Sequence, residues 1–258
     1  MTTHDCDLCG SAEFTPLEVA RPYVGDEQIP VVCKGCGFVY IRERRTSEEV
    51  IESWKQLYAT KAYDPTLPGV RARLWYVAEW IEQKYGNLFG QSLFDVGCGD
   101  GWLVDECRGR GADVSGREPA FHRQPAGVFM NLDFVTITWT LENCVDCIGM
   151  LKAARALLKP DGRLIVATGS RILVPPRKRM SAYFSRTPAD THCFRWSART
   201  LELAAHRAGL QLDAENDWQQ NDVLLKSFRI AGPAPGVPIG DYPPDVLDYF
   251  QNWARTWP

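Results

Sequence analysis

Hydrophobic residues recur along the middle of the chain with two alternating periods. Short apolar runs with the period of strands predict four strands, near 92–96, 112–117, 133–139 and 163–168. Apolar residues spaced three and four positions apart predict the intervening helices, near 101–109, 146–158 and 197–208. Alternation of strands and helices is typical of a doubly wound, mostly parallel sheet with helices on both faces. In such α/β folds the ligand crevice lies at the carboxyl ends of the strands.

Helical patterns also occur on both sides of this region. Thr46-Ser-Glu-Glu49 resembles a capping box and predicts a helix that ends near residue 58. An amphipathic pattern predicts a second helix over 70–85, which Gly86 ends. After a linker rich in Pro and Gly, the segment 241–258 predicts a short amphipathic helix. The sequence leaves open whether this last helix packs on the same chain, on a partner or on a second subunit.

Two cysteine pairs near the start of the chain have the spacing of a metal site. They are Cys6-Asp-Leu-Cys9 and Cys33-Lys-Gly-Cys36. Two Cys-x-x-Cys pairs separated by a hairpin-length spacer are typical of a tetrahedral four-thiolate Zn²⁺ site. Redox-active pairs normally open a helix after a buried strand, and neither pair does so. We therefore expect Cys6, Cys9, Cys33 and Cys36 to bind a structural Zn²⁺ that has no open coordination position.

Composition narrows the class of protein. The chain has 258 residues, of which 45% are hydrophobic, and its formal net charge is −3. No apolar stretch approaches the length of a membrane span, and the first residues lack the pattern of a signal peptide. Nine cysteines, four of them in the predicted metal site, suit a reducing compartment better than a disulfide framework. A cytoplasmic location is the resulting expectation.

A glycine-rich turn follows the first strand of the predicted sheet. The strand ends in Asp95, and Gly97, Gly99 and Gly101 come next. Glycine adopts positive φ readily and lets a ligand lie against backbone N–H groups. Glu118 ends the next predicted strand, where a carboxylate can accept hydrogen bonds from both hydroxyls of a ribose. These residues together predict a nucleoside site.

The spacing of the glycines distinguishes between nucleoside ligands. A dinucleotide motif would need a glycine where Trp102 stands, and the Gly-Lys-Ser/Thr of a P-loop is absent. Asp-x-Gly-x-Gly-x-Gly with a downstream Glu resembles the first motif of class I S-adenosylmethionine-dependent methyltransferases. That resemblance implies a Rossmann-like fold, a glycine turn facing the methionine part of S-adenosylmethionine, and an acid holding its ribose. The cofactor-binding residues it implies are Asp95, Gly97, Cys98, Gly99, Gly101, Glu118 and Pro119.

The resemblance covers about residues 90–212. Leu157-Leu-Lys-Pro-Asp-Gly-Arg-Leu164 is similar to a segment common in this family and predicts a turn between a helix and a strand. The two cysteine pairs ahead of such a domain resemble a bacterial group that methylates sugars and other small metabolites. Asp190-Thr-His-Cys-Phe-Arg-Trp-Ser197 is similar to a segment of the same group.

The chain departs from the family pattern in two places. In the family, a helix and a third strand usually follow the acid that holds the ribose, and the loop after that strand contacts adenine. In this chain only residues 122–132 are available for this unit. The usual His-x-Leu-Glu-His after the fourth strand appears within Thr138-Trp-Thr-Leu-Glu-Asn143, which removes both histidines. A degenerate, non-catalytic member that serves as a binding or scaffold protein therefore stays open.

Positive charge is concentrated after the last predicted parallel strand. Between Arg171 and Arg199 seven Lys and Arg residues stand against one acidic residue. Such charge beside the crevice favours an anionic small-molecule or glycan acceptor such as a nucleotide-sugar. The candidate substrate-binding residues are Arg177, Lys178, Arg179 and Arg195. RNA is an alternative acceptor, which the acidic net charge of the whole chain disfavours.

Methyl transfer from a sulfonium to an oxygen or carbon acceptor needs alignment and a base. Histidine titrates near neutral pH and suits that role. His192 is the first candidate for the base, because it lies in the loop after the last predicted parallel strand. His122, shortly after Glu118, is the second.

The sequence thus divides into four expected parts. They are a zinc-binding module (1–45), a helical connector (46–89), an S-adenosylmethionine-binding methyltransferase domain (90–230), and a linker with a C-terminal helix (231–258). The oligomeric state is not predicted.

Overall fold

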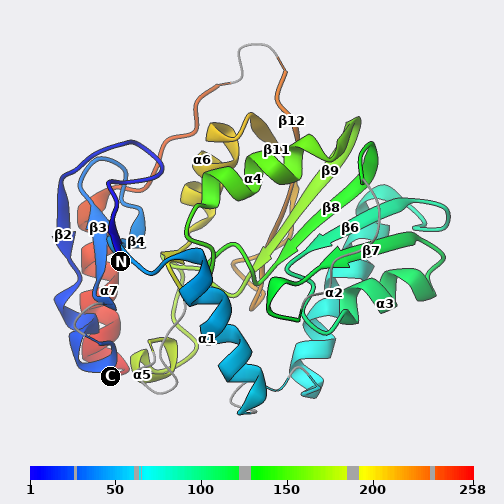
Figure 1. Cartoon of the computed structure of the whole chain (residues 1–258). Helices are drawn as coiled ribbons and strands as arrows, with labels where there is room; N and C mark the ends of the chain where they lie inside the picture. Colours follow the sequence, from blue (N-terminus) through cyan, green and yellow to red (C-terminus); the bar gives the residue numbers. More distant parts are fainter. Residues whose placement is uncertain (26–27, 61–63, 65, 122–128, 185–191, 233–235) are drawn as a thin grey trace.

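The computed structural model describes residues 1–25, 28–60, 64, 66–121, 129–184, 192–232 and 236–258. Its larger part is built on a six-stranded sheet (Figure 1). The strands are β6 (Ser92–Val96), β7 (Asp113–Arg117), β8 (Leu132–Thr138), β9 (Leu158–Thr168), β11 (Leu210–Glu215) and β12 (Leu224–Ile230). The strand order is β11-β12-β9-β8-β6-β7. Neighbours among β6, β7, β8 and β9 pair in parallel, whereas β12 pairs antiparallel with both β9 and β11. The predicted α/β fold with a mostly parallel sheet is confirmed.

Helices cover both faces of this sheet (Figure 1). α2 (Pro68–Tyr85) and α3 (Trp102–Gly109) bury their apolar sides against one face. α4 (Cys147–Ala156) and α6 (Ala198–Arg207) pack on the other. The alternation along a strand explains why both faces need cover, since Ile165 joins the cluster with α2 and α3 while Val166 joins the cluster with α4 and α6.

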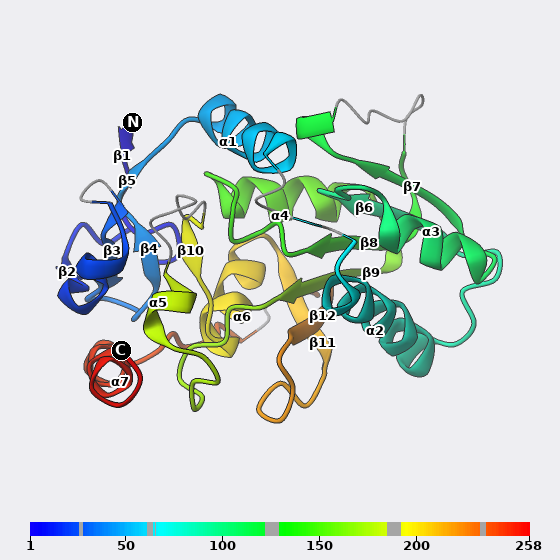
Figure 2. The ribbon, with the colours of Figure 1, turned by 90° about the horizontal axis from the view of Figure 1, so that it is seen from below.

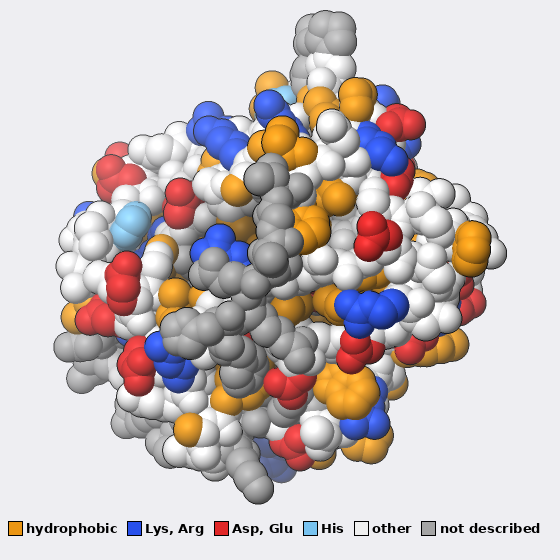
Figure 3. All heavy atoms as spheres, turned by 45° about the vertical axis from the view of Figure 1, so that its right-hand side comes forward, with side chains coloured by type: hydrophobic (Ala, Val, Ile, Leu, Met, Phe, Trp, Pro, Cys, Tyr) orange, Lys and Arg blue, Asp and Glu red, His pale blue; other side chains and the backbone are white. Residues whose placement is uncertain are grey.

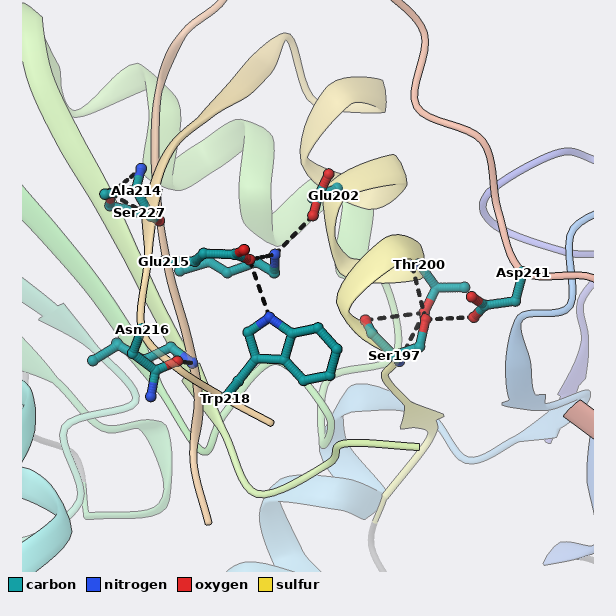
Figure 4. Close-up of polar contacts among 11 residues, drawn as sticks. Ser197, Thr200, Glu202, Ala214, Glu215, Asn216, Trp218, Ser227 and Asp241 are labelled. Carbon is teal, nitrogen blue, oxygen red and sulfur yellow. Dashed lines mark hydrogen bonds and ion pairs between the residues drawn. The ribbon is translucent and has the colours of Figure 1, made fainter. Parts of the chain in front are cut away.

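The strands at one side of the sheet were not predicted, and a buried charge explains why. Lys226 interrupts the apolar pattern of β12, yet its side chain is fully buried. It pairs with Glu202 of α6 at 2.7 Å and with Glu215 of β11, two side chains that lie close together in Figure 4. A buried lysine needs such partners, because an isolated charge is costly away from water.

The predicted Pro-Asp-Gly turn before the last parallel strand lies inside β9 itself. The ladder between β8 and β9 shifts register there, because Leu132 pairs with Leu158 whereas Phe134 already pairs with Arg163. The extra residues form an irregularity in the ladder, and the strand starts earlier than the sequence pattern indicates.

The connection after β7 is short in the part of the chain that is described. It consists of the 3-10 turn η3 (Pro119–Phe121), and residues 129–131 then lead into β8. β7 is the edge strand of the sheet. No additional strand or α-helix is seen here among the described residues, in agreement with the shortened spacing in the sequence.

The N-terminal region forms a second, antiparallel sheet. Its first three strands are β2 (Phe14–Pro16), β3 (Pro30–Cys33) and β4 (Val39–Ile41), and the 3-10 helix η1 (Glu18–Tyr23) lies between β2 and β3. Two short strands, β1 (Thr2–Thr3) and β5 (Glu43–Arg44), form a separate pair. A fourth strand, β10 (Phe194–Arg195), lies between β9 and β11 in the sequence and pairs with β4. The N-terminal sheet is therefore completed by a segment that connects two strands of the large sheet.

The C-terminal helix α7 (Pro243–Thr256) packs back on this N-terminal sheet (Figures 1 and 2). Phe250 and Trp253 share an apolar cluster with Val32 of β3 and with residues of α5 (Met180–Tyr183). Just before α7, the backbone N–H of Asp241 donates to the Cys36 carbonyl at 3.0 Å, and its carboxylate accepts from Ser197 at the start of α6 (Figure 4). The structure thus resolves the open question of where this helix lies.

A further helix, α1 (Ser47–Ala59), connects the two sheets (Figure 2). Thr46 and Glu49 form the predicted capping box, in which each side chain accepts a hydrogen bond from the other residue's backbone N–H.

Among the helices described, none is long and apolar enough to cross a lipid bilayer.

Candidate functional site

A cavity of about 720 Å³ lies at the carboxyl ends of β6, β7 and β8. This volume is within the range of small-molecule and cofactor sites, about 300–1,000 Å³. The helices α1 and α2 contribute Trp54, Tyr58 and Leu74 to its walls, and α4 contributes Met150. Of the predicted cofactor-binding residues, those that line it are Asp95, Gly97, Cys98, Gly99, Glu118 and Pro119.

The glycine turn has the backbone conformation that requires glycine. Gly97, Gly99 and Gly101 have φ angles of 76°, 51° and 88°, and Gly101 is the N-cap of α3. A Cβ atom on Gly97 would lie 2.3 Å from Oγ1 of Thr140, which closes the space behind the turn. At Gly97 and Gly99 the turn therefore presents backbone to the cavity.

We expect Gly97→Ala to lose cofactor affinity and stability together, because the new methyl group would meet Thr140 as well as a strained φ. Gly86→Ala is the matched control: its φ is 90°, but nothing lies within 4 Å of the added Cβ. The difference in unfolding free energy between the two variants should be about 1–3 kcal/mol in urea titrations. Equal losses would show that the contact with Thr140 is unimportant.

Glu118 is held in place by the backbone of the same turn. Its Oε2 accepts a hydrogen bond from the Gly99 N–H at 3.2 Å, and its Oε1 accepts from the Ala120 N–H at 2.9 Å. Each carboxylate oxygen keeps a second lone pair for another donor. The carboxylate is thus oriented toward the cavity with spare acceptor capacity.

Asp95 is buried beneath the turn, with 1% of its surface exposed. Its Oδ1 accepts a hydrogen bond from the Thr136 hydroxyl at 2.6 Å. Burial raises the pKa of this carboxyl to about 7, the Thr136 hydrogen bond opposes the rise, and the nearby charge of Glu118 adds to it. Asp95 therefore binds a proton in the folded chain at pH values where the unfolded chain has released it.

This raised pKa predicts the pH dependence of stability. Between about pH 4 and pH 7 the folded chain retains the Asp95 proton and the unfolded chain does not, so stability falls as pH rises. We expect the unfolding free energy to drop by about 1–2 kcal/mol more in wild type than in Asp95→Asn between about pH 5.5 and pH 7.5. Urea titrations at both pH values test this. Because both proteins contain the other buried carboxyls, the difference between them isolates the contribution of Asp95. An equal change of unfolding free energy with pH in both proteins would contradict the prediction.

The other end of the cavity carries a second set of polar groups. His192, the first candidate for the base, lines the cavity together with Glu142, Asn143 and Asp146. The Glu142 backbone carbonyl accepts hydrogen bonds from the N–H groups of Cys193 and Phe194, at 2.7 and 3.1 Å. The loop after β8 and the segment around His192 are therefore fixed to each other. His122, the second candidate, lies outside the described residues.

The four basic residues predicted to bind substrate are not among the described residues that line this cavity. Arg177 pairs with Asp222 at 2.7 Å, and Lys178 lies over the Tyr183 ring. Arg195 is 3% exposed, with its guanidinium stacked over the rings of Tyr183 and Phe184.

Arg179, the fourth basic candidate, is exposed at the start of α5. Among the described residues that line the cavity, the basic side chain is that of Arg73 in α2.

Several lining residues were given no functional role by the sequence. Glu142 is the clearest, because it occupies the glutamate position of the His-x-Leu-Glu-His pattern and could have been identified by that signal. Arg73, Trp54 and Tyr58 belong to helices outside the glycine motif, and no local pattern marks them.

The four cysteines of the N-terminal pairs meet in one cluster. Their Sγ atoms all lie within 4.8 Å of one another, with Cys6 and Cys36 at 3.6 Å and Cys9 and Cys33 at 3.4 Å. Thiolates bound tetrahedrally at about 2.3 Å from one Zn²⁺ are about 3.8 Å apart. The donor set and its spacing fit a four-thiolate site.

The cysteine cluster is linked to the cavity by buried hydrogen bonds. Arg44 donates to the carboxylate of Asp7, which lies within the first cysteine pair, and to the carbonyl of Val145, which lines the cavity. The Ile41 N–H donates to the Cys193 carbonyl at 2.8 Å, next to His192. The N-terminal sheet therefore supports the end of the cavity that holds His192 and Glu142.

Comparison with known proteins finds curated relatives that are named ubiquinone biosynthesis O-methyltransferase. Proteins named ubiquinone biosynthesis O-methyltransferase in Acinetobacter baumannii (strain AYE) and Bordetella avium (strain 197N) are each 29% identical to this chain, over 194 and 177 residues. These alignments cover 62% and 56% of this chain and 78% and 72% of the relatives. The protein of that name in Aeromonas salmonicida (strain A449) is 32% identical over 117 residues, 36% of this chain, and the chain spans only 49% of its length.

A solved structure shows the same fold. It is the Burkholderia thailandensis 1,6-didemethyltoxoflavin-N1-methyltransferase with bound 1,6-didemethyltoxoflavin and S-adenosylhomocysteine. The match has a TM-score of 0.54 at 12% identity and covers 86% of this chain and 100% of the other. The narrower resemblance to sugar methyltransferases stays a prediction.

The family model described as methyltransferase domain matches residues 63–215, more than half of the chain. This match agrees with the sheet order, with the glycine turn and with the fold of the solved neighbour. The chain therefore belongs to the class I S-adenosylmethionine-dependent methyltransferases.

Proposed function

We propose that this protein transfers the methyl group of S-adenosylmethionine to a hydroxyl oxygen of a small, largely apolar acceptor. The observation that carries the proposal is one continuous cavity with the glycine turn and Glu118 on one side and His192 and Glu142 on the other. Such an arrangement accommodates a cofactor and an acceptor side by side. The names of the curated relatives, all O-methyltransferases, support an oxygen acceptor.

The residues divide into two groups by role. Glu118 accepts hydrogen bonds from the ribose hydroxyls, while the turn at Gly97 and Gly99 lies against the methionine part. The bound cofactor supplies a sulfonium methyl group that is open to in-line attack. His192 takes the proton of the acceptor hydroxyl as the oxygen–methyl bond forms, and the apolar helices exclude water. The products are S-adenosylhomocysteine, the methyl ether and a proton on His192.

The charges around the cavity favour an uncharged acceptor over an anionic one. The described lining contains Asp100, Glu118 and Asp146, besides the carboxyls of Asp95 and Glu142, whose pKa burial raises, against Arg73 and His192. The anionic glycan or nucleotide-sugar acceptor predicted from the sequence depends on Arg177, Lys178, Arg179 and Arg195, which contact other groups or solvent. An anion would therefore meet mostly negative charge in this cavity.

RNA receives no support from the face of the molecule that Figure 3 shows. On the face in Figure 3, Lys and Arg side chains are interspersed with Asp and Glu. A nucleic-acid footprint is normally a continuous basic surface.

We also propose that the four N-terminal cysteines bind one Zn²⁺. With four protein thiolates no coordination position is open, so the ion stabilises the N-terminal sheet and takes no part in methyl transfer.

The proposed function is tested by calorimetry and by transfer of labelled methyl groups. We expect micromolar binding of S-adenosylmethionine, followed by methyl transfer to members of a panel of neutral phenols and alcohols. Nucleotide-sugars and RNA, tested in parallel, should remain unlabelled. Labelling of nucleotide-sugars alone would restore the anionic acceptor. Absence of S-adenosylmethionine binding by folded, zinc-loaded protein would favour the scaffold alternative.

A further inference from the structure

Three buried polar atoms without partners lie around the same cavity. They are Nε1 of Trp102, Nε1 of Trp139 and Oε2 of Glu142, and each residue lines the cavity. No hydrogen-bond partner is found for any of them among the described residues. Buried polar groups are nearly always paired, since an unpaired one costs about as much as the hydrogen bond it lacks. Because these three atoms belong to residues that line the cavity, a ligand bound there is a candidate partner for them.

Trp139 is held in an unusual backbone conformation. Its φ is 50°, a left-handed value that is uncommon for a bulky residue and is often found at functional sites. Two hydrogen bonds hold this conformation: the Trp139 N–H donates to the Ala167 carbonyl at 2.8 Å, and the Asn143 side chain donates to the Trp139 carbonyl at 3.0 Å. The backbone of Trp139, a residue that lines the cavity, is thus fixed on both sides of its Cα atom.

The Trp139 side chain also lies close to a second backbone segment. A Cβ atom on Gly169 would come within 3.3 Å of its Nε1. A side chain at this position would make a tight contact with the indole, and glycine avoids it.

Glu142 is a buried acceptor on the same loop. It is 2% exposed, and its Oε1 accepts a hydrogen bond from the Thr168 hydroxyl at 2.8 Å while Oε2 has no partner. His192, Arg195 and Cys144 are the ionisable groups that face it. One oxygen thus fixes the carboxyl, and the other is left to accept from a ligand.

Aromatic and apolar side chains form the rest of this part of the cavity. Trp54 and Tyr58 come from α1, Leu74 from α2 and Met150 from α4. Flat aromatic walls favour a flat ring as ligand, because ring faces stack on one another. Polar recognition would then fall to the few donors and acceptors along the edge of the ring.

We infer that Trp139 and Glu142 form a donor–acceptor pair that recognises a hydroxyl-bearing aromatic acceptor. The Trp139 Nε1–H donates to an oxygen of the acceptor, and Glu142 Oε2 accepts a hydrogen bond from a hydroxyl other than the one that His192 deprotonates. These two residues determine specificity, and His192 remains the base. The inference rests on the proposed function, because it names the class of acceptor for that same cavity.

Three probes of similar size separate the two hydrogen bonds. Phenol both donates and accepts, anisole only accepts, and toluene does neither. Their dissociation constants are measured by ligand-observed NMR on protein saturated with S-adenosylhomocysteine. We expect wild type to bind phenol most tightly, then anisole and then toluene, with steps of about fivefold per hydrogen bond.

Each variant should remove one of these two differences in affinity between the probes. Trp139→Phe should weaken phenol and anisole about fivefold and leave toluene unchanged, since it removes the donor. Glu142→Gln should abolish the preference for phenol over anisole, since it places an amide where the accepting oxygen was. Glu142→Leu removes the acceptor without introducing an amide, whose oxygen could rotate into the position of Oε2. The matched controls Trp75→Phe and Glu52→Gln change exposed residues outside the lining and should keep the wild-type ranking.

Each variant must bind S-adenosylhomocysteine as wild type does, which shows that the fold and cofactor side are intact. An unchanged ranking of the probes in Trp139→Phe or in both Glu142 variants would overturn the inference alone. No binding of phenol to the loaded wild type would do the same. Failure of wild type to bind S-adenosylhomocysteine would overturn the proposed function and the inference with it.

Discussion

Glu118→Ala is expected to weaken S-adenosylmethionine binding by about 100-fold or more. A carboxylate that accepts from two ribose hydroxyls makes two hydrogen bonds to a charged group, each worth about 1.5–3 kcal/mol. Each 1.4 kcal/mol corresponds to about tenfold in affinity. The Glu118 side chain is already oriented by Gly99 and Ala120, so little of this energy is spent on ordering it. Isothermal titration calorimetry measures the change directly.

Glu18→Ala is the control for this experiment. Glu18 also accepts hydrogen bonds from a neighbour, Arg21, but it is exposed on η1 and outside the described cavity lining. Its replacement should leave the affinity unchanged. If Glu118→Ala also binds S-adenosylmethionine within about twofold of wild type, the ribose is held elsewhere and the assignment of this carboxylate is wrong.

The cofactor side of the cavity was open to prediction because its residues are close in sequence. The segment from Asp95 to Gly101 is a single strand and turn, and Glu118 ends the adjacent parallel strand. Parallel strands with a short crossover place their carboxyl ends side by side. Local spacing therefore specifies the geometry, and the positive φ angles of the three glycines follow from it.

The acceptor side could not be predicted in the same way because distant segments form it. Trp54, Leu74 and Met150 come from three helices, α1, α2 and α4, that meet only through tertiary packing. The charges after β9 illustrate the difficulty: Arg177 finds Asp222, a residue far along the chain, and Arg195 is buried against aromatic rings. A count of charges along the sequence carries no information about such partners.

The same limit applies to the edges of the fold. β12 was missed because buried Lys226 breaks its apolar run, and its partners Glu202 and Glu215 belong to other elements. Where a motif is local, as in the capping box at Thr46, sequence and structure agree. Where burial is stabilised by groups from elsewhere, only the structure reveals it.

Cys33→Ser is expected to remove the Zn²⁺ and to lower the melting temperature by more than about 10 °C. Structural zinc contributes about 10–16 kcal/mol in small zinc peptides, and a loss of 1 kcal/mol shifts the melting temperature of a chain this size by about 2–4 °C. The second cysteine pair joins β3 to β4, so loss of the ion would release the turn between these two strands. Metal analysis and thermal unfolding measure both effects.

The effect of zinc loss on the two sides of the cavity should differ, which makes the experiment informative beyond stability. The β4–β10 pairing and the bond from Ile41 to Cys193 hold the segment next to His192, so methyl transfer should be lost. The glycine turn contacts none of these residues in the hydrogen bonds described, so S-adenosylmethionine affinity should change by less than about threefold. Cys107→Ala, at a buried cysteine of α3, is the matched control and should keep the zinc. Retention of one Zn²⁺ by Cys33→Ser would contradict the four-thiolate site, and equal loss of cofactor binding would show that the N-terminal sheet supports the whole cavity.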